Sequence, residues 1–242
     1  MHLGVMAQEY RRQTELPAMA QLSFEERLAM LVDAEWISRH NNKLRRLLKA
    51  ADLRHPEACL EDVDYAPSRR LERSTIARLS NLTWIKERQN LFITGACGTG
   101  KTWLASAFGN AVCRHGMQVL CLRTNRLLGD LVIARSNGSW LKRLSVLKKP
   151  DLLILDDFGL SPLDAIHCRD LLELVDDRDG KGSILITAQL PVSEWHGIFE
   201  DATIADAVLD RIVHKAHRLE LHGPSKRQII PRGQETEYEK GG

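Results

Sequence analysis

A short glycine-rich run between two apolar stretches constrains the fold of this chain more than any other feature. Residues 95–102 read Gly-Ala-Cys-Gly-Thr-Gly-Lys-Thr, an apolar run at 91–94 precedes them, and a helix-forming run at 103–108 follows. A strand, the pattern G-x-x-x-x-G-K-[ST] and a helix in this order form a phosphate-binding loop. An ordinary glycine-rich turn with a chance lysine is the alternative, and both flanking runs argue against it.

The backbone and the side chains of this loop are expected to share the binding of a nucleotide. Its glycines let N–H groups turn toward phosphate oxygens, and the N-terminus of the following helix adds partial positive charge. Lys101 is expected to reach the β- and γ-phosphates, and the Thr102 hydroxyl to hold Mg²⁺. ATP and Mg²⁺ are therefore the predicted cofactors. The predicted loop residues are Gly95, Ala96, Cys97, Gly98, Thr99, Gly100, Lys101 and Thr102.

A second apolar run ends in two carboxylates. Residues 152–155 are all apolar, and Asp156 and Asp157 follow them. Such a run suits a parallel strand covered on both faces, and its C-terminal end is where an open α/β sheet binds its ligand. We expect Asp156 to coordinate Mg²⁺ and Asp157 to orient the attacking water. An ordinary acidic turn after a strand is the alternative.

Strands alternate with helices through the central and C-terminal parts of the chain. An amphipathic helix is predicted at 164–178, and strands are predicted at 91–94, 118–122, 152–155, 183–187 and 217–221. This alternation predicts a three-layer α/β sandwich around a mostly parallel five-stranded sheet with right-handed crossovers.

The N-terminal part of the chain has a different character. Ser23 and Glu26 form a capping-box pattern that opens a helix, and His55-Pro56 is expected to end the helical segment. An acidic, proline-containing connector follows at 57–70. We therefore expect a helical domain at 1–65, an ATPase domain at 66–233 and a disordered tail at 234–242.

Basic residues cluster in the predicted N-terminal helix. Between positions 39 and 54 there are six basic residues and one acid, a net charge of +5, whereas the whole chain carries only +2. Such a cluster is a candidate contact surface for the phosphates of double-stranded DNA, and a solvated helix face is the alternative. The candidate residues are Arg39, Lys43, Arg45, Arg46, Lys49 and Arg54. A second, weaker candidate comprises Lys142, Arg143, Lys148 and Lys149.

The composition of the chain also predicts the cellular compartment in which the protein works. No apolar run approaches the roughly 18–20 residues of a membrane span, and the N-terminus has no apolar signal-peptide core. Five cysteines are scattered without a C-x-x-C pair, which favours free thiols in a reducing compartment. We expect a cytoplasmic protein that does not contact a membrane.

Four stretches together resemble the IstB family of ATP-binding helper proteins from insertion-sequence transposition. They are residues 95–102, 152–159, 186–196 and 206–218. That family is related to the DnaC-type helicase loaders within the AAA+ ATPases. The loop pattern alone fits many nucleotide-binding proteins, whereas the last two stretches are much narrower. With the basic N-terminal helix, the resemblance covers most of residues 20–230.

The resemblance implies roles for further residues. Gln189 falls where these ATPases place a polar sensor of the γ-phosphate, with Thr187 as a second candidate. Arg211 falls where they place an arginine finger that acts in a neighbouring subunit, and a surface helix arginine paired with Asp210 or another nearby acid is the alternative. Arg227 is a weaker candidate for nucleotide contact.

Two departures from the general AAA+ pattern refine what the resemblance implies. Asp157 stands where most AAA+ members carry glutamate, as in the helicase loaders, which suits a slow switch. Only 21 residues follow Leu221, too few for the usual C-terminal helical lid.

The implied function is an ATP-controlled assembly factor. Its subunits would form a homo-oligomer on duplex DNA through ATP-bridged interfaces, deform the target DNA and recruit a cognate transposase, and hydrolysis would release them. A DnaC-like replicative helicase loader is the main alternative. A small-molecule kinase would need a lid insertion that the sequence lacks, and a scaffold that never hydrolyses ATP stays open.

Overall fold

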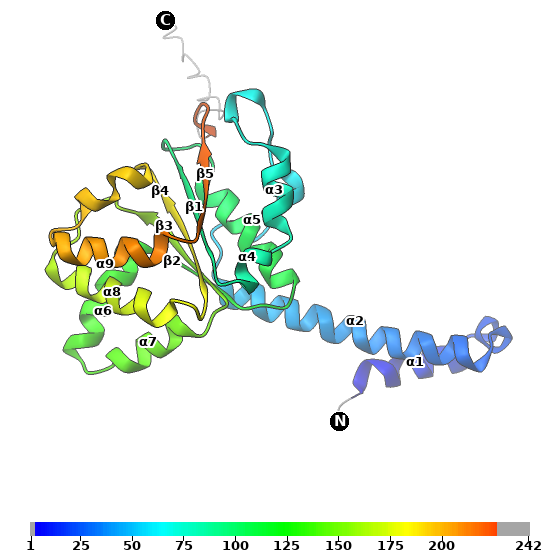
Figure 1. Cartoon of the computed structure of the whole chain (residues 1–242). Coiled ribbons are helices and arrows are strands. Elements are labelled where there is room, and N and C mark those ends of the chain that lie inside the picture. Colours follow the sequence, from blue (N-terminus) through cyan, green and yellow to red (C-terminus); the bar gives the residue numbers. More distant parts are fainter. Residues whose placement is uncertain (1–2, 227–242) are drawn as a thin grey trace, which may run out of the picture.

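A five-stranded parallel sheet forms the centre of the protein, for which we analysed a computed structural model that describes residues 3–226 (Figure 1). The strands are β1 (Asn90–Gly95), β2 (Val119–Arg123), β3 (Leu152–Phe158), β4 (Ser183–Ala188) and β5 (Ala216–Leu221). Their order is β2-β3-β4-β1-β5, and each neighbouring pair is parallel. The predicted five-stranded sheet is therefore confirmed, and it is parallel throughout.

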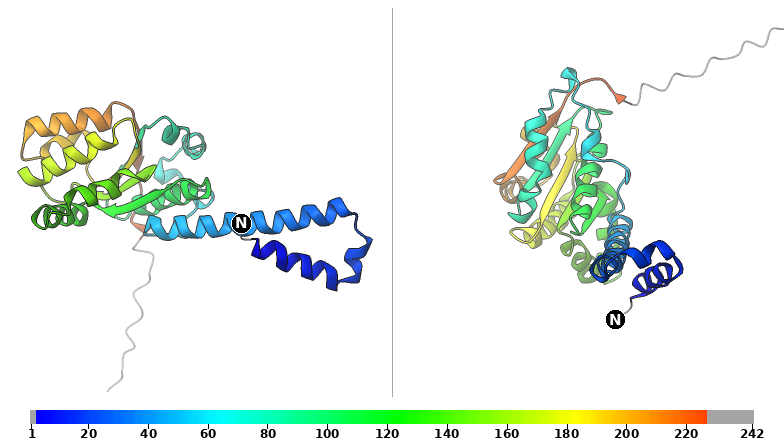
Figure 2. Two further views of the ribbon diagram at one scale, coloured as in Figure 1. Left: turned by 90° about the horizontal axis from the view of Figure 1, so that it is seen from below. Right: turned by 90° about the vertical axis from the view of Figure 1, so that its right-hand side faces the viewer.

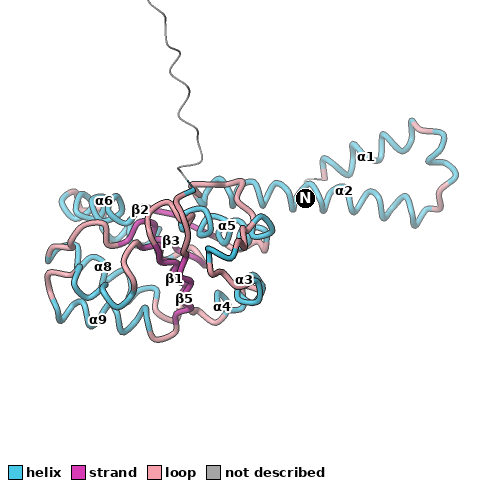
Figure 3. The backbone as a smooth tube through the Cα atoms, turned by 90° about the horizontal axis from the view of Figure 1, so that it is seen from above, coloured by secondary structure: helices cyan, strands magenta, loops and turns pink. Residues whose placement is uncertain are grey.

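Helices cover both faces of this sheet. One face carries α3 (Arg73–Ser80), α4 (Thr83–Lys86), α5 (Lys101–Arg114) and the end of α2 (Phe24–Ala51). The other carries α6 (Thr124–Ser136), α7 (Trp140–Lys148), α8 (Ala165–Arg178) and α9 (Ala202–Val213). Successive residues of β1 point to opposite faces, so that Phe92 joins one hydrophobic core and Ile93 the other. The predicted three layers are visible in Figure 3.

An aromatic cluster fixes the segment that follows β4. Trp195 lies in the short helix η4 (Val192–Ile198) and is fully buried. Its ring centroid lies 4.8 Å from that of Phe92 and 4.9 Å from that of Phe158. Its indole N–H donates to the Leu190 carbonyl at 3.1 Å, which satisfies the one polar group of this side chain. The segment after Gln189 is thus anchored on the core.

A helical arm projects from the sandwich (Figure 2). It consists of α1 (Gly4–Glu15), the turn η1 (Pro17–Gln21) and the first part of α2. The predicted capping box is present, because Ser23 Oγ accepts from the Glu26 N–H at 3.2 Å and Glu26 accepts from the Ser23 N–H at 2.8 Å. The predicted helix end at His55-Pro56 is wrong by one turn. The helix stops at Ala51, since Asp52 adopts a left-handed conformation with φ 51°.

The connector joins the arm to the sandwich and contains the turns η2 (Leu60–Asp62) and η3 (Pro67–Arg69). Leu53 and Val63 are buried in the core beneath α5. The domain division at residue 65 stays a prediction, and the predicted tail at 234–242 lies outside the described residues, as does Arg227. In the described part of the chain, no α-helix follows β5. None of the helices described between residues 3 and 226 has the length and apolarity needed to cross a membrane.

Candidate nucleotide-binding site

The loop between β1 and α5 has the backbone geometry that anion binding needs. Gly98 and Gly100 have φ values of 80° and 92°, a region that favours glycine. The helix α5 begins at Lys101, so its first N–H groups open onto the loop. The predicted strand–loop–helix unit is therefore present at the C-terminal edge of the sheet.

The lysine of the loop is held against its own backbone. Lys101 Nζ donates to the carbonyls of Gly95 and Ala96, each at 2.8 Å, and the residue is 7% exposed. The Lys101 ammonium group therefore already lies inside the loop that is expected to bind the phosphates. Exchange of a carbonyl for a phosphate oxygen replaces a neutral acceptor with a charged one and strengthens the hydrogen bond.

The two predicted metal ligands lie together below the loop. Thr102 Oγ1 donates to Asp156 Oδ1 at 2.9 Å, and Thr187 Oγ1 donates to the same oxygen at 2.6 Å. Asp156 is 2% exposed. Mg²⁺ prefers oxygen ligands and uses one or two protein groups together with phosphates and water, so this pair fits the ion. Among the residues described, no cluster of three or more His, Cys, Asp or Glu side chains offers a metal site of its own.

Asp157 has an unusual backbone conformation at the end of β3. Its φ is +60°, and the pairing register of β3 with β4 shifts between Leu155 and Phe158. The Asp157 N–H donates to Thr187 Oγ1 at 3.0 Å, and its carboxylate lies 3.7 Å from Arg123 Nε. A left-handed non-glycine residue held by its surroundings is typical of functional sites. The sequence predicted the residue and gave no sign of this conformation.

A cavity of about 480 Å³ opens above the loop. This volume lies in the usual range for small-ligand sites, roughly 300–1,000 Å³. The predicted site residues that line it are Cys97, Gly98, Gly100, Lys101, Thr102, Asp157 and Gln189. Thr187 is fully buried beneath it, where its hydroxyl binds the Asp156 carboxylate and accepts from the Asp157 N–H. Of the two candidate sensors, only Gln189 reaches the cavity.

Arg211 is not among the residues that line the cavity. It lies near the end of α9, donates from Nη1 to the Ala207 carbonyl at 2.7 Å and forms an ion pair with Asp176 of α8. A role in the cavity of its own subunit is therefore not supported by its position. The alternative to an arginine finger was a surface arginine paired with a nearby acid. In the structure that acid is Asp176, and Asp210 instead lies 3.2 Å from His214.

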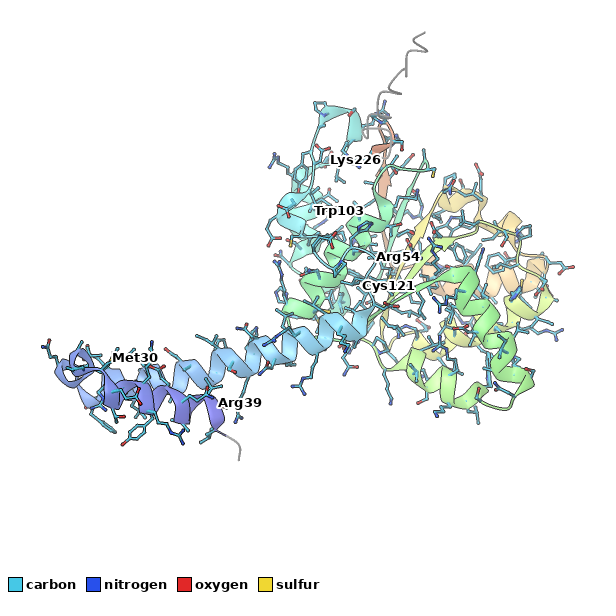
Figure 4. The ribbon with its side chains drawn as sticks, turned by 180° about the vertical axis from the view of Figure 1, so that it is seen from behind. Met30, Arg39, Arg54, Trp103, Cys121 and Lys226 are labelled. Atoms are coloured by element: carbon cyan, nitrogen blue, oxygen red, sulfur yellow. The ribbon has the colours of Figure 1, made fainter. Side chains whose placement is uncertain are left out.

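The predicted DNA-contact residues are all exposed, and they extend along α2 and its C-terminus. Arg39 lies on the arm and Arg54 lies at the sandwich (Figure 4). Arg39 pairs with Glu35 at 2.7 Å, and Arg45 donates to Asn42 at 2.9 Å. They therefore form a row along the helix instead of one compact patch.

The two predicted basic clusters meet at one place. Lys43 and Arg46 of α2 line a groove of about 430 Å³ together with Lys149, which follows α7. Lys148 and Arg143 are engaged by Asp177 at 2.7 Å and Asp130 at 3.0 Å. Only part of the second cluster thus extends the first.

Sequence reasoning missed five charged residues at the cavity, among them Asp62 in the connector and Arg123 at the end of β2. Asp64 and Arg69 belong to the connector, and Lys226 follows β5, and all three line the cavity. The connector was interpreted only as an acidic linker, because its contact with the loop depends on the path of the chain between distant segments. A single arginine in a linker carries no local signal of that contact.

Comparisons with known proteins agree with this geometry. The sequence profile of the family described as IstB-like ATP binding protein matches residues 1–231. An insertion sequence ATP-binding protein of Sinorhizobium fredii is 44% identical over 228 residues, which covers 94% of this chain and 93% of that protein. The ATP-binding protein of insertion sequence IS1162 from Pseudomonas fluorescens is 47% identical over 193 residues and covers 80% and 84% of the two chains.

Solved structures share the fold at lower sequence identity. The DnaC helicase loader is 20% identical, with a TM-score of 0.56 over 68% of this chain and 97% of that chain. DnaI is 20% identical, with a TM-score of 0.59 over 76% and 93%. These likenesses show the fold of the sandwich, and the family match covers the arm as well. The chain therefore belongs to the family of IstB-like ATP-binding proteins and is an ATPase.

Proposed function

We propose that this protein is an ATP-dependent assembly factor on double-stranded DNA that serves a transposase in insertion-sequence transposition. The observation that carries the proposal is a complete phosphate-binding loop, with Thr102 and Asp156 joined beneath it, in a chain of this family. The names of its relatives, which are insertion sequence ATP-binding proteins, support the biological setting. A cytoplasmic location goes with this proposal.

The nucleotide site has a role for each of its residues. Lys101 and the N–H groups of the loop bind the phosphates, and Thr102 and Asp156 hold Mg²⁺, which neutralises phosphate charge. Asp157 orients the attacking water, and Gln189 senses the γ-phosphate from the end of β4. Support comes from the joint presence of Asp157 and Gln189 on the cavity wall.

Assembly requires a second subunit. Arg211 acts as an arginine finger in the site of a neighbour, so that ATP bridges subunits and hydrolysis depends on assembly. Its position outside the cavity of its own chain supports an action in trans. Its ion pair with Asp176 must then be exchanged for phosphate contact when subunits meet.

The basic row along α2 contacts the DNA. Arg39, Lys43, Arg45, Arg46, Lys49 and Arg54 bind phosphates, which position the protein without reading sequence. Binding is therefore strongly salt-dependent. Bending the target costs on the order of 1–6 kcal/mol, which several phosphate contacts offset. The cognate transposase recognises the assembled and deformed complex.

A DnaC-like helicase loader is the second candidate, and the shared fold of the sandwich favours it. The two functions differ in the substrate of the N-terminal part. A loader uses this part on a helicase, whereas the proposed factor uses it on duplex DNA.

The test is assembly on DNA. Full-length protein is sized on duplex and on single-stranded DNA with ATP, with ADP and without nucleotide. We expect large assemblies only with ATP and duplex DNA, and loss of these assemblies in a Lys43→Gln, Arg46→Gln variant. A matched variant, Arg11→Gln, Arg12→Gln, removes the same charge from α1 and should assemble normally. A monomer that ignores duplex DNA or prefers single strands would favour the loader.

A further inference from the structure

Three segments that are distant in the sequence converge on one side of the phosphate-binding loop. They are the connector with Asp64 and Arg69, the loop itself, and the segment after β5 with Lys226. In Figure 4, Lys226 lies beside the cyan segment that contains the end of the connector. The main chain links them, since the Lys226 N–H donates to the Gly98 carbonyl at 3.0 Å and the His222 N–H donates to the Arg69 carbonyl at 3.4 Å.

Arg69 is a buried charged residue at the place where these three segments meet. The residue is 8% exposed, and its Nη2 donates to the Thr99 carbonyl of the loop. A Cβ placed on Gly100 would lie 3.2 Å from the same nitrogen, so the guanidinium lies directly against the loop backbone. The turn η3 ends at Arg69 and directs its side chain toward the cavity that it lines.

The guanidinium has more donors than its protein partners use. An arginine carries five N–H donors. Nη1 lies 3.4 Å from Asp64 Oδ2, a long contact, and the buried Nε has no hydrogen-bond partner within residues 3–226. A buried donor without an acceptor is costly, and a charged one more so. Nε itself is too deeply buried to meet a ligand, but Arg69 lines the cavity, and the N–H groups of Nη1 and Nη2 that the Thr99 and Asp64 contacts leave over can bind an acceptor there.

Charge points to an anion. Asp64 is shared by two cations, because its Oδ2 also lies 3.0 Å from Lys226 Nζ. The Ala66 N–H, Lys226 and Arg69 lower the pKa of Asp64 to about 2, so one negative charge faces two positive ones at neutral pH. Over the whole cavity, the four cations Arg69, Lys101, Arg123 and Lys226 outnumber the three carboxylates of Asp62, Asp64 and Asp157, so the lining has a net charge of +1.

Sheet topology separates this wall from the hydrolytic residues. Asp157 lies at the end of β3 and Gln189 follows β4, on one side of β1 and its loop. Lys226 follows β5, on the other side of β1. A triphosphate whose terminal phosphate faces Asp157 therefore extends its nucleoside end toward Arg69 and Lys226.

We propose that Arg69 is a nucleotide-binding residue that contacts the phosphates nearest the nucleoside, with Asp64 as its positioning residue and Lys226 as a second cation on the same wall. This inference rests on the proposed orientation of ATP and adds a contact that ATP and ADP share. Nη2 keeps its hydrogen bond to the Thr99 carbonyl, and the remaining N–H groups of the two terminal nitrogens bind the phosphate. A guanidinium offers this fork, whereas a lysine offers a point charge.

The experiment measures the dissociation constants of ATP and ADP for purified full-length variants. We expect Arg69→Ala to raise both constants by about 10- to 100-fold and by the same factor, since a charged hydrogen bond is lost in both complexes. Arg69→Lys should recover part of the affinity. Arg78→Gln removes a charge from the exposed surface of α3 and should change neither constant.

The control for a purely structural role is the melting temperature of the nucleotide-free protein. Arg69→Ala with a lower melting temperature and unchanged dissociation constants would show that Arg69 only braces the loop, and would overturn the proposal. A loss confined to ATP would place Arg69 at the γ-phosphate and would also overturn it. Asp64→Asn offers a second variant that leaves the guanidinium in place, and a parallel but smaller loss for both nucleotides is expected.

The result also separates this inference from the proposed function. If Arg69→Ala leaves the dissociation constant of ADP unchanged, the role of Arg69 is wrong, but the proposed assembly on duplex DNA still stands. If the protein does not assemble on duplex DNA, the proposed function is wrong, but Arg69→Ala should still weaken ATP and ADP binding by the same factor.

Discussion

The projecting arm and the phosphate-binding region differ in which side chains they expose and which they bury. The arm leaves large apolar side chains in solvent, with Phe24 73% and Trp36 63% exposed. The phosphate-binding region buries charges instead, with Lys101 7% and Asp156 2% exposed. The arm is thus defined by contacts between neighbouring helices, and the site by contacts between distant segments. The two parts should therefore respond independently to substitution.

The arm depends on few contacts of its own. Glu35 accepts from the N–H groups of Val5 at 3.1 Å and Met6 at 3.0 Å, and so caps the start of α1. Gln13 is buried against α2 and donates to the Arg27 carbonyl at 3.2 Å. Neither of the two hydrophobic cores includes a described residue before Leu44, so the order of the arm rests on such contacts between α1 and α2.

The largest expected effect comes from Lys101→Ala. Removal of the ammonium group takes the charged partner of the β- and γ-phosphates from the loop, so ATP binding should be lost. Isothermal titration of the full-length protein measures it, and hydrogen exchange in α1 should be unchanged. Retained ATP affinity would contradict the assignment of the loop.

Arg211→Ala should produce the next largest effect, and only in the assembled state. An arginine finger contributes about 10³-fold or more to turnover, so DNA-stimulated hydrolysis should fall by about that factor. Nucleotide affinity of the dilute protein should stay the same. Asp176→Asn, which releases the same ion pair, serves as the matched control. An equal loss of turnover in unassembled protein would show that Arg211 acts in cis.

Asp157→Asn should slow hydrolysis by about 100-fold or more while ATP binding and assembly persist, because the amide no longer polarises water. Turnover assays and sizing on duplex DNA measure the two properties separately. Loss of ATP binding would instead assign Asp157 a structural task at the end of β3.

The smallest effect tests the arm. Ser23→Ala removes one half of the capping box and should destabilise the start of α2 by about 1 kcal/mol. Hydrogen exchange should rise in residues 24–28, and the dissociation constant of ATP should not change. A weaker ATP affinity would show that arm and site are coupled.

The sequence predicted those features that depend on short segments. The strand–loop–helix unit, the carboxylates at the end of β3 and the capping box at Ser23 each occupy a few consecutive residues, and the structure contains all three. The sequence pattern also located all five strands, since continuous apolar runs marked the first four and alternation marked the edge strand β5.

The remaining features depend on how distant segments meet. The left-handed Asp157 is held by Thr187 on a neighbouring strand, and Arg69 reaches the loop across a connector that has little regular structure. Neither interaction has a local pattern. The end of α2 was misplaced for a related reason, since Leu53 turns into the core before the proline that was expected to end the helix.

The continuity of α2 has a mechanical consequence. This single helix of 28 residues starts at the tip of the arm and ends on the sandwich, where Leu47 and Ala51 pack in the core beside α5 and β2. At 1.5 Å per residue it is a lever of about 42 Å. A tilt of about 5° at its base displaces its tip by about 4 Å. A rearrangement of α5 too small to alter the sheet would therefore be amplified into a movement as large as an amino acid at the far end of the molecule.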